Sequence, residues 1–248
     1  MNIIQSKLLS RYPEVRCGVS TRNGGASLPP FGMNLSFNVG DDIDHVNENR
    51  RRFFHEFGTN NEHVAFTKQV HGSEINFVDT PGFNDSCDAL MTSTQGLFLA
   101  ISVADCIPIF LFDTKLKCIA AVHSGWRGSK LQIIAKAVDE MKGEFNSDPE
   151  NLIAFIGPSA GVCCYEVGEE VASQFDEQFV VRKAGSKPHI DLKRFNKHLL
   201  MKKSVSEQNI EVSEYCTICN PQIFHSYRRD KEKSGRMMGI IGMPSTSS

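Results

Sequence analysis

The chain has 248 residues, 40% of them hydrophobic, which is enough for one large core or for two small domains in close contact. Its 27 basic and 29 acidic residues give a formal net charge of -2, so the composition argues against nucleic-acid binding through bulk charge. Residues 1–15 contain no continuous apolar run, and the most apolar stretch, residues 96–112, includes Asp105 and Pro108. We therefore expect neither a signal peptide nor a membrane-spanning helix, and no membrane partner.

The eight cysteines indicate reduced thiols and a cytoplasmic location, because a secreted disulfide scaffold would be shorter and denser in cysteine. Cys216 and Cys219 form a C-x-x-C pair. No second C-x-x-C pair completes a four-cysteine zinc site, so the sequence predicts no metal there. The adjacent Cys163 and Cys164 are expected only to pack near a helix that begins at Glu166.

In chain order, the first expected elements are a strand at 17–20, a long ordered loop at 21–42 and a helix at 44–57. The loop is rich in Gly, Asn, Asp and Pro, which is typical of loops that carry function. Asp44 is the expected cap of the helix. Further short, apolar, β-branched runs predict strands at 75–78, 97–103, 107–112, 119–122, 152–156 and 237–241.

Three more helices are expected, at 129–145, 166–179 and 191–203. In the first, Ser129 is the expected cap, and apolar residues recur at helical spacing. Regular strand–helix–strand alternation is rare, which favours an α+β fold with a mixed sheet or sandwich flanked by helices. We expect a single domain over residues 1–241 and a flexible tail over 242–248.

Three polar residues, Asp105, Cys106 and His123, interrupt the apolar stretch where a buried sheet should contain only aliphatic side chains. Pro108 lacks a backbone donor and restricts the residue before it, so a break between strands is expected just upstream. His123 ends the next expected strand. If these two strands are neighbours, their ends bring Cys106 and His123 together.

A second histidine, His71 in "TKQVHGSEI", also stands where a strand gives way to a turn. With Cys106 and His123 it forms a ligand set that suits Zn²⁺, and three protein ligands leave the fourth position open, as in catalytic zinc sites. Two other interpretations stay open. Cys106 is a small buried hydrophobe beside ordinary core histidines, or Cys106 and His123 are a nucleophile and its base, which leaves His71 without a role.

Five segments resemble the laccase-domain family, also called YfiH-like or multicopper polyphenol oxidase-like. They are "STRNGGAS…FGMNLSFNVGDD", "QVHG", "ADCIPIFLFD…AAVHSGWRG", "IGPSAGVCCYEVGEEV" and "CTICNPQIFHSYRRDKEKSGRMMGII". The resemblance runs from about residue 18 to residue 239. It implies a metal site formed by His71, Cys106 and His123, the same three residues.

The resemblance also implies purine nucleoside chemistry. Adenosine, inosine, guanosine and methylthioadenosine would react with phosphate to give the free base and ribose 1-phosphate, with adenosine deamination as a side reaction. An open zinc site suits both reactions. Phosphate needs donors, and arginine offers paired ones, so Arg22, Arg127 and Arg228 are the expected substrate-binding residues. Backbone N–H groups of a helix starting at Ser129 would add to them.

Asp105 is the expected catalytic carboxylate, either as the hydrogen-bond partner that orients His123 or as a proton carrier. Three alternative functions remain. The first is a copper-dependent polyphenol oxidase, because two histidines and a cysteine resemble a blue-copper ligand set; however, no two of the eight histidines form the His-x-His pairs of a trinuclear copper cluster. The second is a Cys/His amidase that edits peptidoglycan precursors. The third is a non-enzymatic module that binds a nucleotide or metal.

Overall fold

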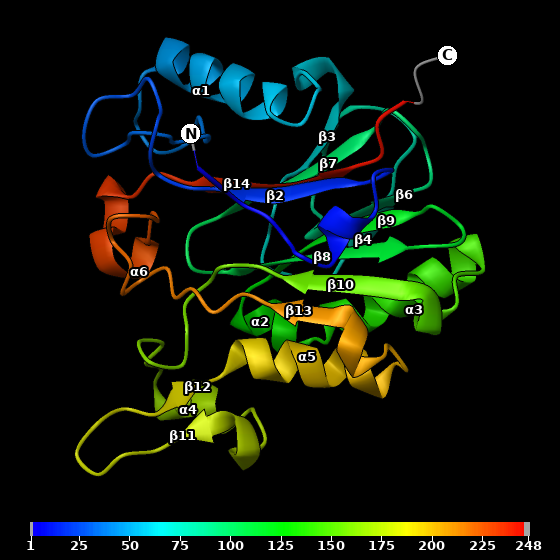
Figure 1. The fold of residues 1–248 in the computed structure, drawn as a ribbon. Coiled ribbons are helices and arrows are strands. Elements are labelled where there is room, and N and C mark those ends of the chain that lie inside the picture. Colours follow the sequence, from blue (N-terminus) through cyan, green and yellow to red (C-terminus); the bar gives the residue numbers. More distant parts are fainter. Residues whose placement is uncertain (1, 246–248) are drawn as a thin grey trace.

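The computed structural model describes residues 2–245 and contains two six-stranded mixed sheets that pack face to face (Figure 1). The first sheet has the strand order β1-β2-β14-β7-β3-β5. Its strands are β1 (Ile3–Ile4), β2 (Arg16–Ser20), β14 (Met237–Gly242), β7 (Phe98–Val103), β3 (Val64–Thr67) and β5 (Gly82–Asn84).

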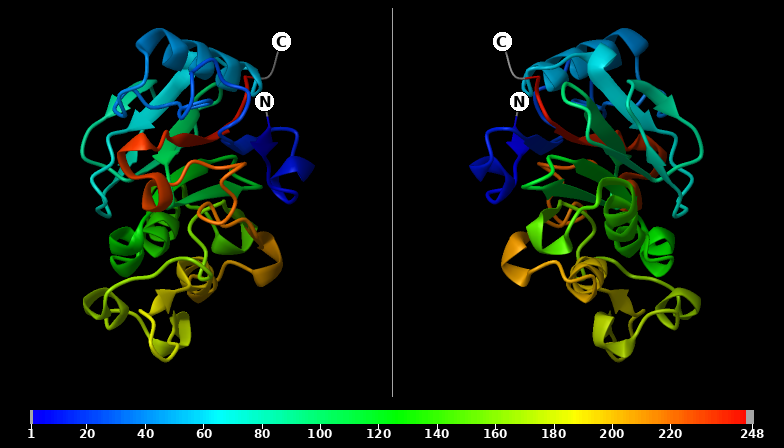
Figure 2. Two further views of the ribbon diagram at one scale, coloured as in Figure 1. Left: turned by 90° about the vertical axis from the view of Figure 1, so that its left-hand side faces the viewer. Right: turned by 90° about the vertical axis from the view of Figure 1, so that its right-hand side faces the viewer.

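The second sheet has the order β13-β10-β8-β9-β6-β4. Its strands are β13 (Ile210–Val212), β10 (Leu152–Ile156), β8 (Ile107–Asp113), β9 (Ile119–Ser124), β6 (Ala89–Thr92) and β4 (Ile75–Phe77). A separate pair, β11 (Val180–Val181) and β12 (His189–Ile190), lies with α4 (Glu169–Ala172) beyond the second sheet in every view (Figure 2).

Helices cover the outer face of each sheet, so the molecule has four layers (Figure 1). Helix α1 (Ile43–His55) packs Phe53 and Phe54 on the first sheet, against Phe66 and Phe98. The second sheet is covered by α3 (Ile133–Phe145) and α5 (Leu192–Lys202), with the short α2 (Trp126–Lys130) between them and β9. Helix α6 (Tyr227–Asp230) lies at one end of the sheets.

The uninterrupted apolar sequence of β8 follows from its place in these layers. Its residues alternate between two cores: Phe110 and Phe112 point between the sheets, and Ile109 and Leu111 point toward the helices. Because neighbouring side chains of a strand point to opposite faces, a strand covered on both faces needs apolar residues at every position. The covered second sheet is therefore the rigid base on which the polar turns at its ends are held.

The α+β fold with a mixed sandwich flanked by helices is confirmed, and each of the seven predicted strands is present with ends shifted by a few residues. The predicted loop 21–42 contains no helix or strand. The cap of α1 is Asp42, whose side chain accepts the N–H groups of Asp44 and His45, rather than Asp44. The strands that sequence missed are short and include β3 and β6, both next to the polar turns described below.

Two predicted helices are wrong in extent. The helix predicted at 129–145 is broken into α2 and α3, because Gln132 adopts a left-handed conformation with φ of 58°. Gly125 precedes α2, and Ser129 lies inside it, where its hydroxyl bonds Ser124 and Asn196. Of the helix predicted at 166–179, only α4 and a 3₁₀ turn at Glu177–Phe179 are helical.

The flexible tail was predicted to begin too early. Gly242 is the last residue of β14, and Met243 is buried at 2% exposure. Residues 246–248 of that predicted tail lie outside the described residues. Among residues 2–245, no helix is both long and apolar enough to cross a membrane.

The close approach of the sheets can be tested at Gly239 in β14. A Cβ there would lie 2.6 Å from the ring of Phe110 across the interface. We expect Gly239→Ala to lower the free energy of unfolding by about 1–3 kcal/mol, because the packed core must shift. Gly143 in α3 has open space around it, so Gly143→Ala should instead raise stability by about 0.5–1 kcal/mol. Urea unfolding of both variants checks this; equal effects would contradict the packing described.

Candidate metal centre and cleft

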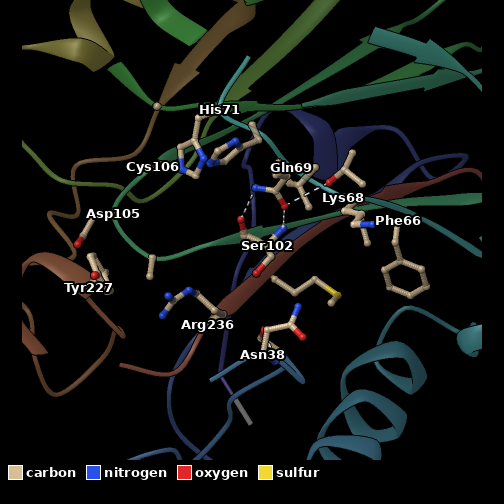
Figure 3. Close-up of a pocket in the computed structure, with 18 of the residues that line it drawn as sticks. Asn38, Phe66, Lys68, Gln69, His71, Ser102, Asp105, Cys106, Tyr227 and Arg236 are labelled. Atoms are coloured by element: carbon tan, nitrogen blue, oxygen red, sulfur yellow. Dashed lines mark hydrogen bonds between the residues drawn. The ribbon is translucent and has the colours of Figure 1, made fainter. Parts of the chain in front are cut away.

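A cleft of about 990 Å³ opens where the chain passes from the first sheet to the second (Figure 3). The turn 104–106 joins the end of β7 in one sheet to the start of β8 in the other. Other walls come from residues 36–39 of the long loop, the segment 66–71, residues 125–127 and α6. As expected, the loop 21–42 contributes to a cleft, but only through its residues 36–39.

Cys106 lies at the base of this cleft because of an abrupt turn. Asp105 has φ of 85°, a left-handed conformation that is uncommon outside glycine, and it redirects the chain into β8. β8 pairs with β9 in a register that sets Pro108 opposite His123. The predicted adjacency of the two strand ends is thus present, and it brings Cys106 to the side of His123.

His71 reaches the same point from a loop that is fixed at two places. Gln69 donates its amide to Ser102 O (2.8 Å) and accepts the N–H of Ser102 (2.8 Å), which ties the loop to β7 (Figure 3). His71 itself has φ of 60°. Its backbone N–H donates to Asp88 Oδ1 at 3.0 Å. The exposed imidazole is therefore held over the cleft by the backbone rather than by packing.

The potential ligand atoms of His71, Cys106 and His123 all lie within 4.8 Å of one another. The two imidazole rings meet edge to face, with centroids 5.0 Å apart and planes at 84°. Gly125 follows β9 beside them, and a Cβ there would lie 3.1 Å from Cys106 Sγ and 3.5 Å from the His71 ring. The sequence-predicted set is brought together, and it forms a candidate metal-binding His/Cys site.

A buried carboxylate, Asp88, organises two of these three residues, and the sequence analysis missed it. It precedes β6, the strand beside β9, and its Oδ1 lies 2.8 Å from His123 Nδ1. It also accepts the N–H groups of Val70, His71 and Gly72 at 3.2, 3.0 and 2.7 Å. An ionised carboxylate only accepts, so Nδ1 of His123 carries the proton and Nε2 is free to bind a cation.

The electrostatics favour a thiolate beside a charged imidazole. Burial alone would raise the pKa of Cys106, but the charge and hydrogen bonds of His123, with a hydrogen bond from His71, lower it to about 6. For His123, burial acts to lower the pKa, but Cys106 and Asp88 outweigh it and raise the pKa to about 9. A metal cation bound to His123 in place of the proton would attract the thiolate of Cys106 in the same way.

The sequence analysis allowed Asp105 to be the residue that orients His123. In the structure, Asp88 forms that hydrogen bond with His123 instead. Oδ1 of Asp105 accepts the Thr217 hydroxyl at 2.6 Å, and its Oδ2 accepts the Ser226 hydroxyl at 3.0 Å and the Arg228 N–H at 2.7 Å. Asp105 therefore ties the start of α6 and the 216–219 turn to the base of the cleft.

Of the predicted phosphate-binding arginines, Arg127 and Arg228 line the cleft and Arg22 does not. The guanidinium of Arg22 donates to the carbonyls of Pro221 and Pro30, which fixes the first part of the long loop outside the cleft. The helix N-terminus predicted at Ser129 is also misplaced, because α2 begins at Trp126. Arg127 is thus already within the first turn of a helix.

Sequence analysis also missed two arginines and an aromatic pair in the cleft. Arg50 and Arg236 line it from α1 and from just before β14, over the rings of Phe37 and Tyr227 respectively. Phe66 and Phe83 stack with centroids 5.0 Å apart. No local motif marks these residues, since they come from elements far apart in the chain. The cleft therefore combines a candidate metal centre, four arginines and an apolar wall.

Fold and site together define an α+β sandwich protein with a histidine–cysteine centre at the base of a cleft. The family model described as "Multi-copper polyphenol oxidoreductase laccase" matches residues 16–244. The chain belongs to this family, and the resemblance stated from its motifs is confirmed.

The relatives and solved structures agree with this assignment. The chain is 38% identical over 232 residues to "Purine nucleoside phosphorylase" of Deinococcus radiodurans, covering 91% of this chain and 88% of the relative. It is 32% identical over 247 residues to "Purine nucleoside phosphorylase YlmD" of Bacillus subtilis, covering 93% and 89%. The crystal structure of YlmD from Geobacillus stearothermophilus has a TM-score of 0.90 at 30% identity, covering 94% and 93%.

The role of Asp88 can be tested by unfolding the metal-free protein. Asp88→Ala leaves a buried imidazolium and three loop N–H groups without their acceptor, so we expect a loss of about 3–5 kcal/mol in the free energy of unfolding. Asp79 is exposed, and Asp79→Ala is the matched control, expected to change stability by no more than about 0.5 kcal/mol. Urea denaturation in the presence of a chelator measures both, and similar values would refute the role given to Asp88.

Proposed function

We propose that this protein is a zinc-dependent purine nucleoside phosphorylase that also deaminates adenosine at a lower rate. The observation that carries the proposal is the convergence of His71, Cys106 and His123 within 4.8 Å at the base of a cleft that also contains arginines. Relatives named purine nucleoside phosphorylase support the reaction type. All eight cysteines are free thiols, which supports a protein that acts in a reducing, cytoplasmic environment.

The proposed ligands fit zinc by their chemistry. Two imidazoles and a thiolate are ligands that zinc prefers, and three of them leave a position for substrate. Because Nδ1 of His123 donates to Asp88, Nε2 of His123 is the nitrogen left to bind an ion. A zinc-bound histidine usually has such a carboxylate partner on its other nitrogen. When bound, the ion would supply Lewis acidity to an oxygen or nitrogen of the substrate. Residues of the chain must perform the remaining tasks.

In phosphorolysis, an oxygen of phosphate forms a bond to the anomeric carbon while the bond from that carbon to the purine nitrogen breaks. Arg127 and Arg228 are the proposed phosphate donors, because a guanidinium binds an oxyanion through paired hydrogen bonds. The purine would pack on the apolar wall of Phe66 and Phe83. The departing base needs a proton, and we propose Asp105 as the proton carrier, oriented by Thr217 and Ser226.

Deamination needs the same cleft with water in place of phosphate. Water adds to C6 of the adenine ring, ammonia leaves, and adenosine becomes inosine. The ribose does not react in deamination. Phosphorolysis and deamination therefore bring different atoms of adenosine to the candidate metal centre. We expect deamination to be the slower reaction, because the arginines serve an anion that this reaction lacks.

The second candidate is a copper-dependent polyphenol oxidase, which the family's description favours. Within residues 2–245, the groups of side chains close enough to hold an ion include only two histidines, His71 and His123. A trinuclear copper cluster needs more, so copper at this site would act alone. Copper loading should then give oxygen-dependent turnover of phenols that zinc abolishes; absence of such turnover decides against this candidate.

A cysteine amidase is the third candidate, favoured by the low pKa of Cys106 beside His123. The two chemistries separate cleanly, because a thiolate nucleophile works without metal. Under the amidase hypothesis, chelation would preserve activity and Cys106→Ala would abolish it. Under our proposal, chelation abolishes activity, and added zinc restores it.

Replacing the thiolate ligand tests the proposal directly. Cys106→Ser should lower kcat/KM for phosphorolysis of inosine by ~10²-fold or more, since the Lewis acid contributes several kcal/mol to the transition state. Free base and ribose 1-phosphate are quantified by chromatography, with zinc content measured on the same samples. Cys17→Ala is the control, because Cys17 is buried at 7% exposure in β2 and outside the site. Wild-type protein with zinc that yields neither product, and no inosine from adenosine, would end the proposal.

The phosphate-binding role distinguishes two arginines that sequence alone placed in one group. Arg228→Met should raise the KM for phosphate roughly 10- to 100-fold, the loss expected for a hydrogen bond to a charged group. Arg22→Met should leave that KM unchanged, because Arg22 bonds backbone carbonyls outside the cleft. Initial rates against phosphate concentration measure both. A larger effect at Arg22 than at Arg228 would place phosphate elsewhere.

A further inference from the structure

Four cysteines outside the cleft come together in a second group, which we call the thiol cluster: Cys163, Cys164, Cys216 and Cys219. Their sulfur atoms all lie within 4.8 Å of one another, and none forms a disulfide. The sequence analysis expected no metal here, because the C-x-x-C pair lacked a second pair. The adjacent cysteines, about fifty residues earlier in the chain, supply it in space.

Two loops hold the cluster in place. The loop after β10 and the loop after β13 are joined by a parallel bridge between Ser159 and Cys216, and the Thr217 N–H donates to Ser159 O at 3.0 Å. The Gly161 N–H donates to Cys216 Sγ at 3.2 Å. A Cβ at Gly161 would lie 3.1 Å from Cys216 Cβ and 3.3 Å from Cys163 Sγ. Backbone contacts therefore hold the two loops, and with them the four cysteines, together before any ion binds.

The spacing of the sulfurs suits a tetrahedral thiolate site. With Zn–S bonds of about 2.3 Å, tetrahedral geometry sets the sulfurs ~3.8 Å apart. Cys163 Sγ and Cys219 Sγ are 3.8 Å apart, and the upper limit of 4.8 Å for the group requires only small side-chain rotations. A disulfide needs about 2.05 Å between sulfurs. The cluster is thus closer to a metal site than to a bonded pair.

A buried positive charge lies beside the cluster. The buried ammonium of Lys193 is fixed close by, donating to Ser213 O at 2.8 Å and to Tyr215 O at 2.6 Å. Four thiolates around a divalent ion carry a net negative charge, which this ammonium offsets.

We propose that the thiol cluster is a second metal site, a closed structural site for zinc that joins the two loops. Four sulfur ligands leave no open position, and tetrahedral sulfur sites are typical of structural zinc. Cys163 and Cys219 are exposed, which gives the ion a path from solvent. The proposal is independent of the nucleoside chemistry, because none of its four ligands belongs to the His71, Cys106 and His123 centre.

Its consequence is a fixed wall for the cleft. Thr217, between the two cysteines of the C-x-x-C pair, donates to Asp105 at 2.6 Å. Tyr165, the residue after Cys164, lines the cleft beneath the guanidinium of Arg228, 5.1 Å from its ring centroid. A zinc ion in the thiol cluster would therefore hold both residues at their positions in the cleft without contacting substrate.

Zinc content separates the two sites. The full chain, purified under reducing conditions without chelator, should contain two zinc ions per chain by elemental analysis. Cys106→Ser should retain one, the double variant Cys216→Ser/Cys219→Ser should also retain one, and combining all three changes should leave none. Cys17→Ala should keep two. If Cys106→Ser retains no zinc, the thiol cluster is not a zinc site, whatever the outcome for nucleoside phosphorolysis.

A second measurement needs no change at the cluster, so it holds even if the double variant fails to fold. In Cys106→Ser loaded with Co²⁺, the thiol cluster should give the intense thiolate-to-cobalt absorption of a tetrahedral sulfur site. In wild-type protein, zinc should protect Cys163 and Cys219 from alkylation by iodoacetamide, and EDTA should restore labelling, as read by mass spectrometry. Labelling at the same rate with and without zinc would overturn the proposal. So would a disulfide within the cluster that persists after reducing purification.

Discussion

The candidate metal centre depends on the hydrogen bond between Asp88 and His123, which is buried where β6 begins and β9 ends. Asp88 and His123 are 0% and 2% exposed. A buried carboxylate is unfavourable without partners, and this one is satisfied by one imidazole and three N–H groups of the 70–72 loop. The same bonds that stabilise the charge therefore fix a ligand on a strand and a ligand on a loop in one geometry.

The rest of the site follows from how the two sheets meet. The chain leaves the first sheet at β7 and enters the second at β8, and the left-handed Asp105 makes that transfer possible within three residues. Cys106 is thereby placed beside the end of β9, and Asp105 is turned toward α6. Of the three candidate ligands, only His123 lies on a strand of the covered second sheet, and hydrogen bonds and the turn before β8 hold the other two beside it, so the centre is preorganised. The cleft arginines come from α1, α2, α6 and the segment before β14.

The thiol cluster adds a second constraint on the walls of the cleft. It lies where the loops that follow the paired strands β10 and β13 run side by side, at the bridge of Ser159 and Cys216. A metal ion shared by two loops is an effective way to hold them together. On this view, the protein uses metal coordination twice, once in a centre open to substrate and once in a closed site that stabilises the cleft wall.

Sequence alone predicted seven strands of the two sheets, the α+β class and the three side chains that converge, because apolar patterning and long family motifs are local properties of the chain. It did not determine the break between α2 and α3, since the apolar spacing continues across the left-handed Gln132. It also failed to distinguish Arg22 from Arg228, to find Asp88, or to pair Cys163 and Cys164 with Cys216 and Cys219. Each of these depends on which segments become neighbours across strands and loops, and only the tertiary structure, through strand register and the crossing between sheets, decides that.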